Sequence, residues 1–83
     1  MKENFIAIVA QVAELERDKI LLEDSPYNSN LDSLSLVELL VTIEREFEIE
    51  FDDEELFIGN YKTLNDLCEV VIKKVEETYG KDN

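Results

Sequence analysis

Ser33, with its neighbour Asp32, is the residue whose position in the sequence points most clearly to chemistry. It opens the most apolar helix-forming run of the chain, 33–47. As the residue before a helix, Asp32 can accept hydrogen bonds from the backbone N–H groups of Leu34 and Ser35, which have no partner within the helix. The Ser33 hydroxyl would then project from the positive end of the helix dipole. The sequence therefore predicts a helix start at which an anion attached to Ser33 is stabilised.

The groups that usually activate a serine are missing from this chain. It contains no histidine, which removes the common general base, the imidazole metal ligands and the Ser-His and Cys-His nucleophile pairs. The single cysteine, Cys68, lies among apolar residues at helical spacing, so we interpret it as a core residue rather than a reactive thiol. A lone cysteine forms no intramolecular disulfide or thiolate zinc cluster and suits a reducing cytosol. We therefore expect a protein that is not an enzyme, holds no metal and has its serine modified by a partner.

A run of four carboxylates, 52–55, is the other candidate for chemistry. It lacks the alternating oxygen ligands and the central glycine of a calcium-binding loop, so a small calcium buffer is only a third alternative. Asp52 with Glu55 fits better as the capping arrangement of a short helix at 53–58. We expect Gly59 and Asn60 to end that helix, since either residue can take the left-handed conformation.

The periodicity of apolar residues predicts an all-α fold: a small bundle of three main helices, at about 2–18, 33–48 and 63–79, with the short helix between the second and the last. Thr63 with Asp66 is a capping pair at the start of the last helix, and Gly80 stops it. The residues expected in the core are Phe5, Ile8, Val9, Val12 and Leu15, then Leu36, Leu39, Leu40, Ile43 and Phe47, then Leu64, Leu67, Cys68, Val71, Ile72, Val75 and Tyr79.

A long loop follows the first helix, at 19–31, where Pro26 and a high density of turn-forming residues exclude a regular element. Its apolar residues are too numerous for a free linker, so we expect them to hold the loop on the helices and to fix Asp32 and Ser33 in place. These residues are Ile20, Leu21, Leu22, Tyr27 and Leu31. A loop of this length in a compact domain is usually functional, and here it leads to the serine.

Taken together, these features resemble the acyl carrier protein family, also called phosphopantetheine-binding carrier proteins. Asp32, Ser33 and Leu34 match the family's G-x-D-S-L motif, and the helix pattern from Ser35 to Phe47 also matches. Asn30 stands where the motif has glycine. Because asparagine tolerates a positive φ better than other non-glycine residues, we expect the turn to be preserved. The resemblance covers nearly the whole chain.

The resemblance implies a carrier whose arm, 4'-phosphopantetheine, is taken from coenzyme A by a phosphopantetheinyl transferase and joined to Ser33 through a phosphodiester. Because the chain starts at Met1 and has no linker sequence at either end, we expect this carrier to be free-standing. The thiol of the arm would hold an acyl or aminoacyl group as a thioester. Loading enzymes and downstream enzymes of fatty acid, polyketide or nonribosomal peptide biosynthesis would then be partners. In the family, the second helix meets basic patches of such enzymes.

The second helix carries a further apolar stripe on the side away from the core, interspersed with carboxylates, which is typical of a docking surface. The expected docking residues are Leu34, Val37, Glu38, Val41 and Glu44. Part of this face is also expected to pack against the short helix. Arg45 interrupts the acidity there, so partner preference is expected to differ from that of a fatty acid synthesis carrier. An unmodified acidic adaptor would use the same stripe for a basic or apolar partner, and this is the main alternative.

Length and charge set the remaining expectations. The 83 residues make a single domain, 1–83, whose tail from residue 80 frays. With 8 basic and 21 acidic residues, the net charge is −13. Such a charge repels nucleic acids and anionic membranes and favours basic partners. The start of the chain has no basic segment followed by a signal core, so we expect a cytoplasmic protein, and a monomer.

Overall fold

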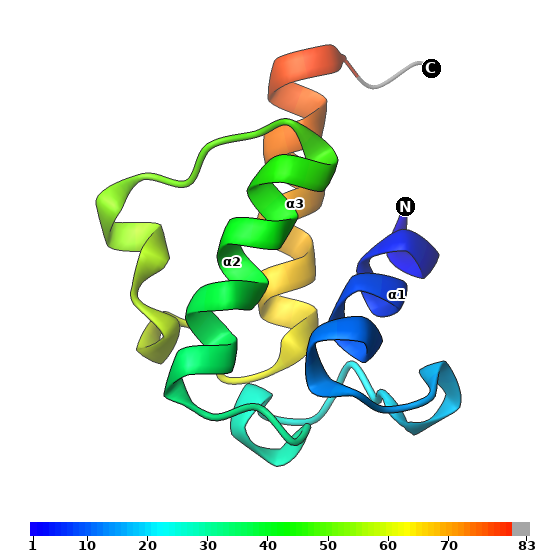
Figure 1. Cartoon of the computed structure of the whole chain (residues 1–83). Helices are drawn as coiled ribbons and strands as arrows, with labels where there is room; N and C mark the ends of the chain where they lie inside the picture. The colour runs from blue at the N-terminus through cyan, green and yellow to red at the C-terminus, as the bar shows by residue number, and fades with distance from the viewer. Residues whose placement is uncertain (81–83) are drawn as a thin grey trace.

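The computed structural model describes residues 1–80, which form three α-helices joined by connections that contain short 3₁₀ turns (Figure 1). The helices are α1 (Lys2–Ala13), α2 (Ser33–Phe47) and α3 (Leu64–Tyr79). The 3₁₀ turns are η1 (Arg17–Lys19), η2 (Pro26–Asn28), η3 (Asp53–Leu56) and η4 (Ile58–Asn60). No strand occurs in the described part of the chain, so the predicted all-α bundle of three main helices is confirmed.

The core lies between the three helices, as the periodicity predicted. Phe5 and Val9 of α1, Leu39 and Ile43 of α2 and Leu67 of α3 are each 0% exposed. Phe47, Val12, Leu15, Ile72 and Val75 lie at the edge of the core and are partly buried.

Tyr79 was wrongly predicted as a core residue. Its side chain is 49% exposed, and its hydroxyl donates a hydrogen bond to the carbonyl of Glu48 at 2.8 Å. The last turn of α3 meets the end of α2 here rather than the core, and the phenol links the two helix ends.

The first helix is shorter than predicted, because it ends at Ala13 rather than near residue 18. Glu14 takes the left-handed conformation with φ of 59°, and the N–H of Leu15 donates back to the carbonyl of Ala10 at 3.0 Å. This reversed hydrogen bond is typical of a Schellman-type helix end. It turns the chain so that Leu15 packs against the core, whereas a continued helix would have carried the chain away from the bundle.

The long connection from α1 to α2 is attached to the bundle by buried side chains and by main-chain hydrogen bonds. Ile20 and Leu31 are buried as predicted, and Leu22 is partly buried. Leu21 and Tyr27 were wrongly predicted to hold the loop, since they are 47% and 55% exposed.

The reason lies in the backbone of the connection. The N–H of Leu64 donates to the carbonyl of Asp24, and the N–H of Asn65 to that of Leu22, both at 2.8 Å. The first amides of α3, which have no partner within the helix, thereby fix residues 22–24 in place. The loop is held at these points through its backbone, which does not require Leu21 to be buried. Tyr27 belongs to η2, whose N-cap residue Ser25 accepts the N–H of Tyr27.

Between α2 and α3, the predicted short helix is present as two 3₁₀ turns rather than an α-helix. The carboxylate of Glu55 accepts the N–H of Asp52 at 2.8 Å, so the capping arrangement is confirmed. The expectation for the end of this helix was wrong, since Gly59 has no left-handed φ and Asn60 belongs to η4. Instead of a left-handed residue, the side chain of Asn60 caps the end of η3, because its amide donates to the carbonyl of Glu54 at 2.6 Å.

Helix α3 begins and stops where the sequence predicted. Thr63 accepts the N–H of Asp66 at 3.1 Å, and Gly80 follows the last turn with φ of 91°. The predicted fraying of residues 81–83 lies outside the described residues. Within residues 1–80, no helix has the length and apolar character needed to cross a bilayer.

Candidate attachment site at the start of helix α2

Asp32 caps α2 as predicted. Its backbone is extended, and its Oδ1 accepts a hydrogen bond from the N–H of Ser35 at 2.8 Å. The N–H of Leu36 donates to the Asp32 carbonyl at 2.9 Å and starts the helical ladder. The hydrogen bonds from the N–H and hydroxyl of Ser35 hold the pKa of Asp32 below its ordinary value, and the N–H of Leu34 adds to the effect. The carboxylate is therefore ionised at neutral pH and is a weak base.

Ser33 is the first residue of α2, and its side chain is exposed to solvent. The N–H groups of Ser33 and Leu34 belong to the first turn of the helix, where no intrahelical acceptor exists. An accessible hydroxyl beside two such amides fits a phosphodiester, because the start of a helix stabilises a negative group. The residues present therefore suit a phosphorylated arm on Ser33.

The turn before this site takes the form that the sequence predicted. Asn30 has a left-handed backbone with φ of 63°, so it takes the conformation for which glycine is the common choice. Its side chain makes a contact that sequence reasoning missed, a 2.7 Å hydrogen bond from Nδ2 to the carbonyl of Ala13. Only the fold brings these two residues together, since they are 17 positions apart.

The outer side of α2 is open, and we call its exposed apolar residues Leu34, Val37 and Val41 the α2 stripe. They are 79%, 58% and 50% exposed. Phe57, beside η3, is 67% exposed and was not recognised from the sequence. The one feature of the sequence that could have indicated it is an aromatic residue in a short segment rich in turn-forming residues.

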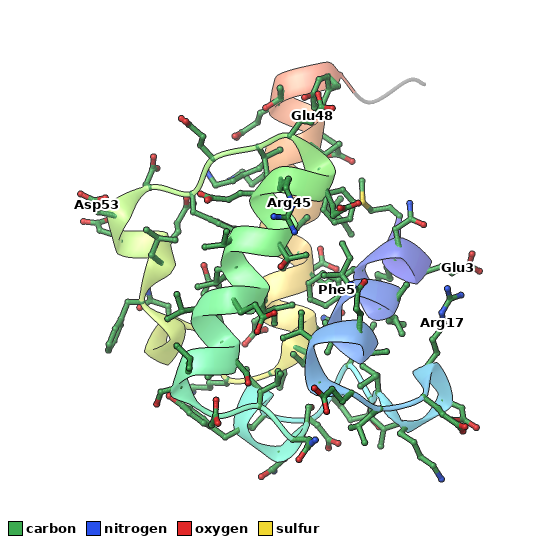
Figure 2. All side chains as sticks on the ribbon, viewed as in Figure 1. Glu3, Phe5, Arg17, Arg45, Glu48 and Asp53 are labelled. Atoms are coloured by element: carbon green, nitrogen blue, oxygen red, sulfur yellow. The ribbon has the colours of Figure 1, made fainter. Side chains whose placement is uncertain are left out.

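The charged residues predicted to surround the α2 stripe differ in their surroundings. Glu38 is exposed. Arg45 of the same helix is also exposed (Figure 2). Glu44 is half-buried, and its Oε2 accepts the N–H of Phe51 at 2.9 Å. One carboxylate oxygen of Glu44 therefore holds the chain that leaves α2.

Two other features lie apart from Ser33. A cavity of about 310 Å³ between α1 and the far end of α2 is lined by Asn4, Ala7, Ile8, Gln11, Glu46 and Phe47. Along residues 1–80, no group of three or more acidic or cysteine side chains is placed to hold a metal ion, and this includes the carboxylates of 52–55.

A small helical bundle that presents an accessible serine at a capped helix start has the architecture of a carrier domain, and the comparisons agree. The family described as "Phosphopantetheine attachment site" matches residues 3–71. An acyl carrier protein homolog of Mycoplasmopsis pulmonis is 37% identical over 67 residues, which cover 81% of this chain and 89% of the relative. The acyl carrier protein of Thermosynechococcus vestitus is 36% identical over 74 residues, with 88% and 89% covered. That of Clostridium perfringens is 31% identical over 78 residues, with 93% and 100% covered.

This chain belongs to the acyl carrier protein family. Membership implies a covalently attached 4'-phosphopantetheine as its cofactor. Members of the family are carriers that work with a phosphopantetheinyl transferase and with biosynthetic enzymes.

Proposed function

We propose that this chain is a single carrier domain that bears its arm on Ser33 and holds an acyl or aminoacyl group on the thiol of that arm. It presents this group to enzymes of fatty acid, polyketide or other specialised biosynthesis. The observation that carries the proposal is the exposed Ser33 hydroxyl at the Asp32-capped start of α2.

The chain's own residues leave the chemistry of loading to a partner. Asp32 is the carboxylate that precedes Ser33 in the chain, but its Oδ1 accepts the N–H of Ser35 and its pKa is lowered. The proton of Ser33 Oγ therefore goes to a base of the transferase. The serine oxygen forms a new bond to the β-phosphorus of coenzyme A, and the nucleoside bisphosphate leaves with the electrons of the broken P–O bond. The protein is a substrate in this step, not an enzyme.

The α2 stripe, together with Glu38 and Phe57, is the surface on which we propose that partner enzymes dock. Its apolar side chains are at least half exposed, the carboxylate of Glu38 is exposed among them, and the chain as a whole carries −13. A partner with an apolar centre and a basic rim would match it. Such a contact is small and weakens with salt, which allows the carrier to leave for its next partner. We place the protein in the cytoplasm, as a monomer.

The alternative is an unmodified acidic adaptor, and the exposure of the α2 stripe is the observation that favours it. An adaptor would bind a basic or apolar partner through Leu34, Val37 and Val41 without using Ser33.

Loading with coenzyme A, magnesium and a broadly tolerant phosphopantetheinyl transferase tests the proposal. We expect the intact mass to rise by one phosphopantetheine, and fragmentation to locate the addition on Ser33. Ser33→Ala should abolish the gain while the helical circular dichroism is kept. Thr78→Ala, which removes an exposed hydroxyl near the end of α3, should load like the parent chain. A folded protein that gains no mass with several transferases would refute the carrier and favour the adaptor.

A further inference from the structure

Asn30 differs from the other left-handed residues of the described chain in its place and in its contacts. Glu14 and Glu48 are the other non-glycine residues with positive φ, and each directly follows the last residue of an α-helix. Asn30 lies in a connection, three residues before Ser33. A glycine would satisfy the backbone here, so the asparagine side chain calls for a separate explanation.

The Nδ2 atom of Asn30 donates to the carbonyl of Ala13 at 2.7 Å, at the short end of the range for N–H···O bonds. Ala13 is the last residue of α1, and the last carbonyls of a helix have no donor within it. The amides of Glu14 and Leu15 turn back to Ala10 and Gln11 and leave the Ala13 carbonyl unused. One side chain thus closes the end of α1 and fixes the start of the serine turn.

From Asn30 the constraint continues along the chain to the serine. Leu31 is 3% exposed and lies in the core, and Asp32 is fixed by its cap on α2. Three consecutive residues before Ser33 are therefore held by three different means: a hydrogen bond to α1, burial and a helix cap.

We propose that Asn30 is a positioning residue for the loading of Ser33, through its hydrogen bond to Ala13. The inference rests on the proposed carrier function. A glycine at this position keeps the left-handed turn but loses the attachment to α1. Without it, the turn at Asn30 samples several arrangements while the rest of the connection stays in place, and the transferase binds only the fraction in which the serine turn is in place. The apparent dissociation constant rises as that fraction falls.

Steady-state loading kinetics of Asn30→Gly test this inference, with coenzyme A saturating and the carrier varied. We expect KM for the carrier to rise about fivefold, the equivalent of one net hydrogen bond, with kcat within about a factor of two. A change in KM without a change in kcat is expected because a carrier that has bound the transferase already has its serine in place. Asn28→Gly, the same substitution at an exposed position of the same connection, should leave KM unchanged.

A second variant and a second measurement separate positioning from general destabilisation. Asn30→Asp keeps a residue that tolerates the left-handed conformation but cannot donate to the Ala13 carbonyl, so KM should rise as in Asn30→Gly. Amide hydrogen exchange should quicken at Asn28 and Ser29, whose N–H groups bond within this connection, and stay slow in the middle of α3.

Wild-type KM in both Asn30 variants would overturn the proposal, and so would a lower kcat at unchanged KM, because the effect would then follow docking. A parent chain that no transferase loads would instead refute the carrier function itself, and the inference with it.

Discussion

The two connections that flank α2 are held to the bundle in different ways. The one before it places Ile20, Pro26, Ser29 and Leu31 in the interior and bonds its main chain to the first turn of α3. The one after it buries Phe51 and Tyr61, near its ends. Its middle, 53–57, is exposed or half-buried, and side-chain polar contacts attach it.

Three of these contacts hold the second connection. Glu44 accepts the N–H of Phe51, the Tyr61 hydroxyl donates to the Glu55 carbonyl at 2.7 Å, and Lys74 of α3 pairs with the Glu55 carboxylate at 2.8 Å. Buried apolar contacts and main-chain bonds cannot be exchanged without local unfolding, whereas partly exposed polar contacts can. The comparison indicates that the chain delivering the serine is rigid, while the chain beside the α2 stripe can adjust to different partners.

The largest expected loss of unfolding free energy is for a substitution in the first connection, the one before α2. Leu31→Ala removes a side chain that is 3% exposed, and we expect it to lower the free energy of unfolding by about 3 kcal/mol in urea denaturation, because it leaves a cavity in the core. Leu21→Ala, in the same connection but 47% exposed, should change it by about 0.5 kcal/mol or less. Equal effects of the two substitutions would contradict the view that burial fixes this connection.

A smaller effect is expected in the second connection. Lys74→Met removes the ion pair with Glu55. The side chain of Lys74 is 16% exposed and that of Glu55 is 30% exposed, so loss of the pair should lower the free energy of unfolding by about 1 kcal/mol. Lys73→Met, an exposed neighbour on the same helix, is the matched control. A loss as large as that of Leu31→Ala would remove the contrast between the two connections.

The same pair should give the protein a dependence on pH. Burial acts to raise the pKa of Glu55, but hydrogen bonds from Lys74 and from the Asp52 N–H outweigh it, so the pKa lies below its ordinary value. The hydrogen bond to Glu55 raises the pKa of Lys74. The ion pair therefore stabilises the fold fully between the ordinary pKa of a glutamate and the ordinary pKa of a lysine. This stabilisation is lost as the pH falls through the lowered pKa of Glu55, or as it rises through the raised pKa of Lys74. Thermal denaturation at pH 7 and pH 3 should show a smaller loss of stability in Lys74→Met than in the parent chain.

The smallest effect on stability is expected at Phe57, where docking should respond instead. Phe57→Ala removes a side chain that is 67% exposed, so the unfolding free energy should stay within about 0.5 kcal/mol. Calorimetric affinity for the transferase should fall about fivefold or more if the ring lies at the centre of the contact.

Gly59 offers a matched variant for this prediction. A Cβ at this position would come within 2.6 Å of the Phe57 ring, so Gly59→Ala keeps the ring but forces it to move. We expect an affinity between those of the parent chain and Phe57→Ala. Parent-like binding by both variants would show that the second connection takes no part in docking.

The helices and their caps could be predicted from the sequence because their signals are local. Asp32, Thr63 and Asp66 have the residue types and spacing of caps, and the core faces follow the helical period. The end of α1 could not be predicted, since it depends on a glutamate in a left-handed conformation rather than on a glycine.

The errors at the surface have a common cause. Leu21 and Tyr27 are apolar enough to predict burial, but the loop is held on α3 through the backbone carbonyls of Leu22 and Asp24 and leaves both side chains exposed. The Asn30 contact was missed for the same reason, since its acceptor lies on another element. Tertiary backbone contacts of this kind leave no periodic pattern in the sequence.

The burial of Cys68 has a practical consequence for counting loaded molecules. It is the only cysteine of the chain, it is 0% exposed, and burial raises the pKa of its thiol. A folded molecule without an arm should therefore be silent to a thiol reagent at neutral pH. A molecule that carries the arm with a free thiol should react once when folded and twice when denatured. The ratio of the two readings therefore measures the fraction of molecules whose arm carries no acyl group. An acyl group on the arm would lower the folded reading from one to zero and the denatured reading from two to one.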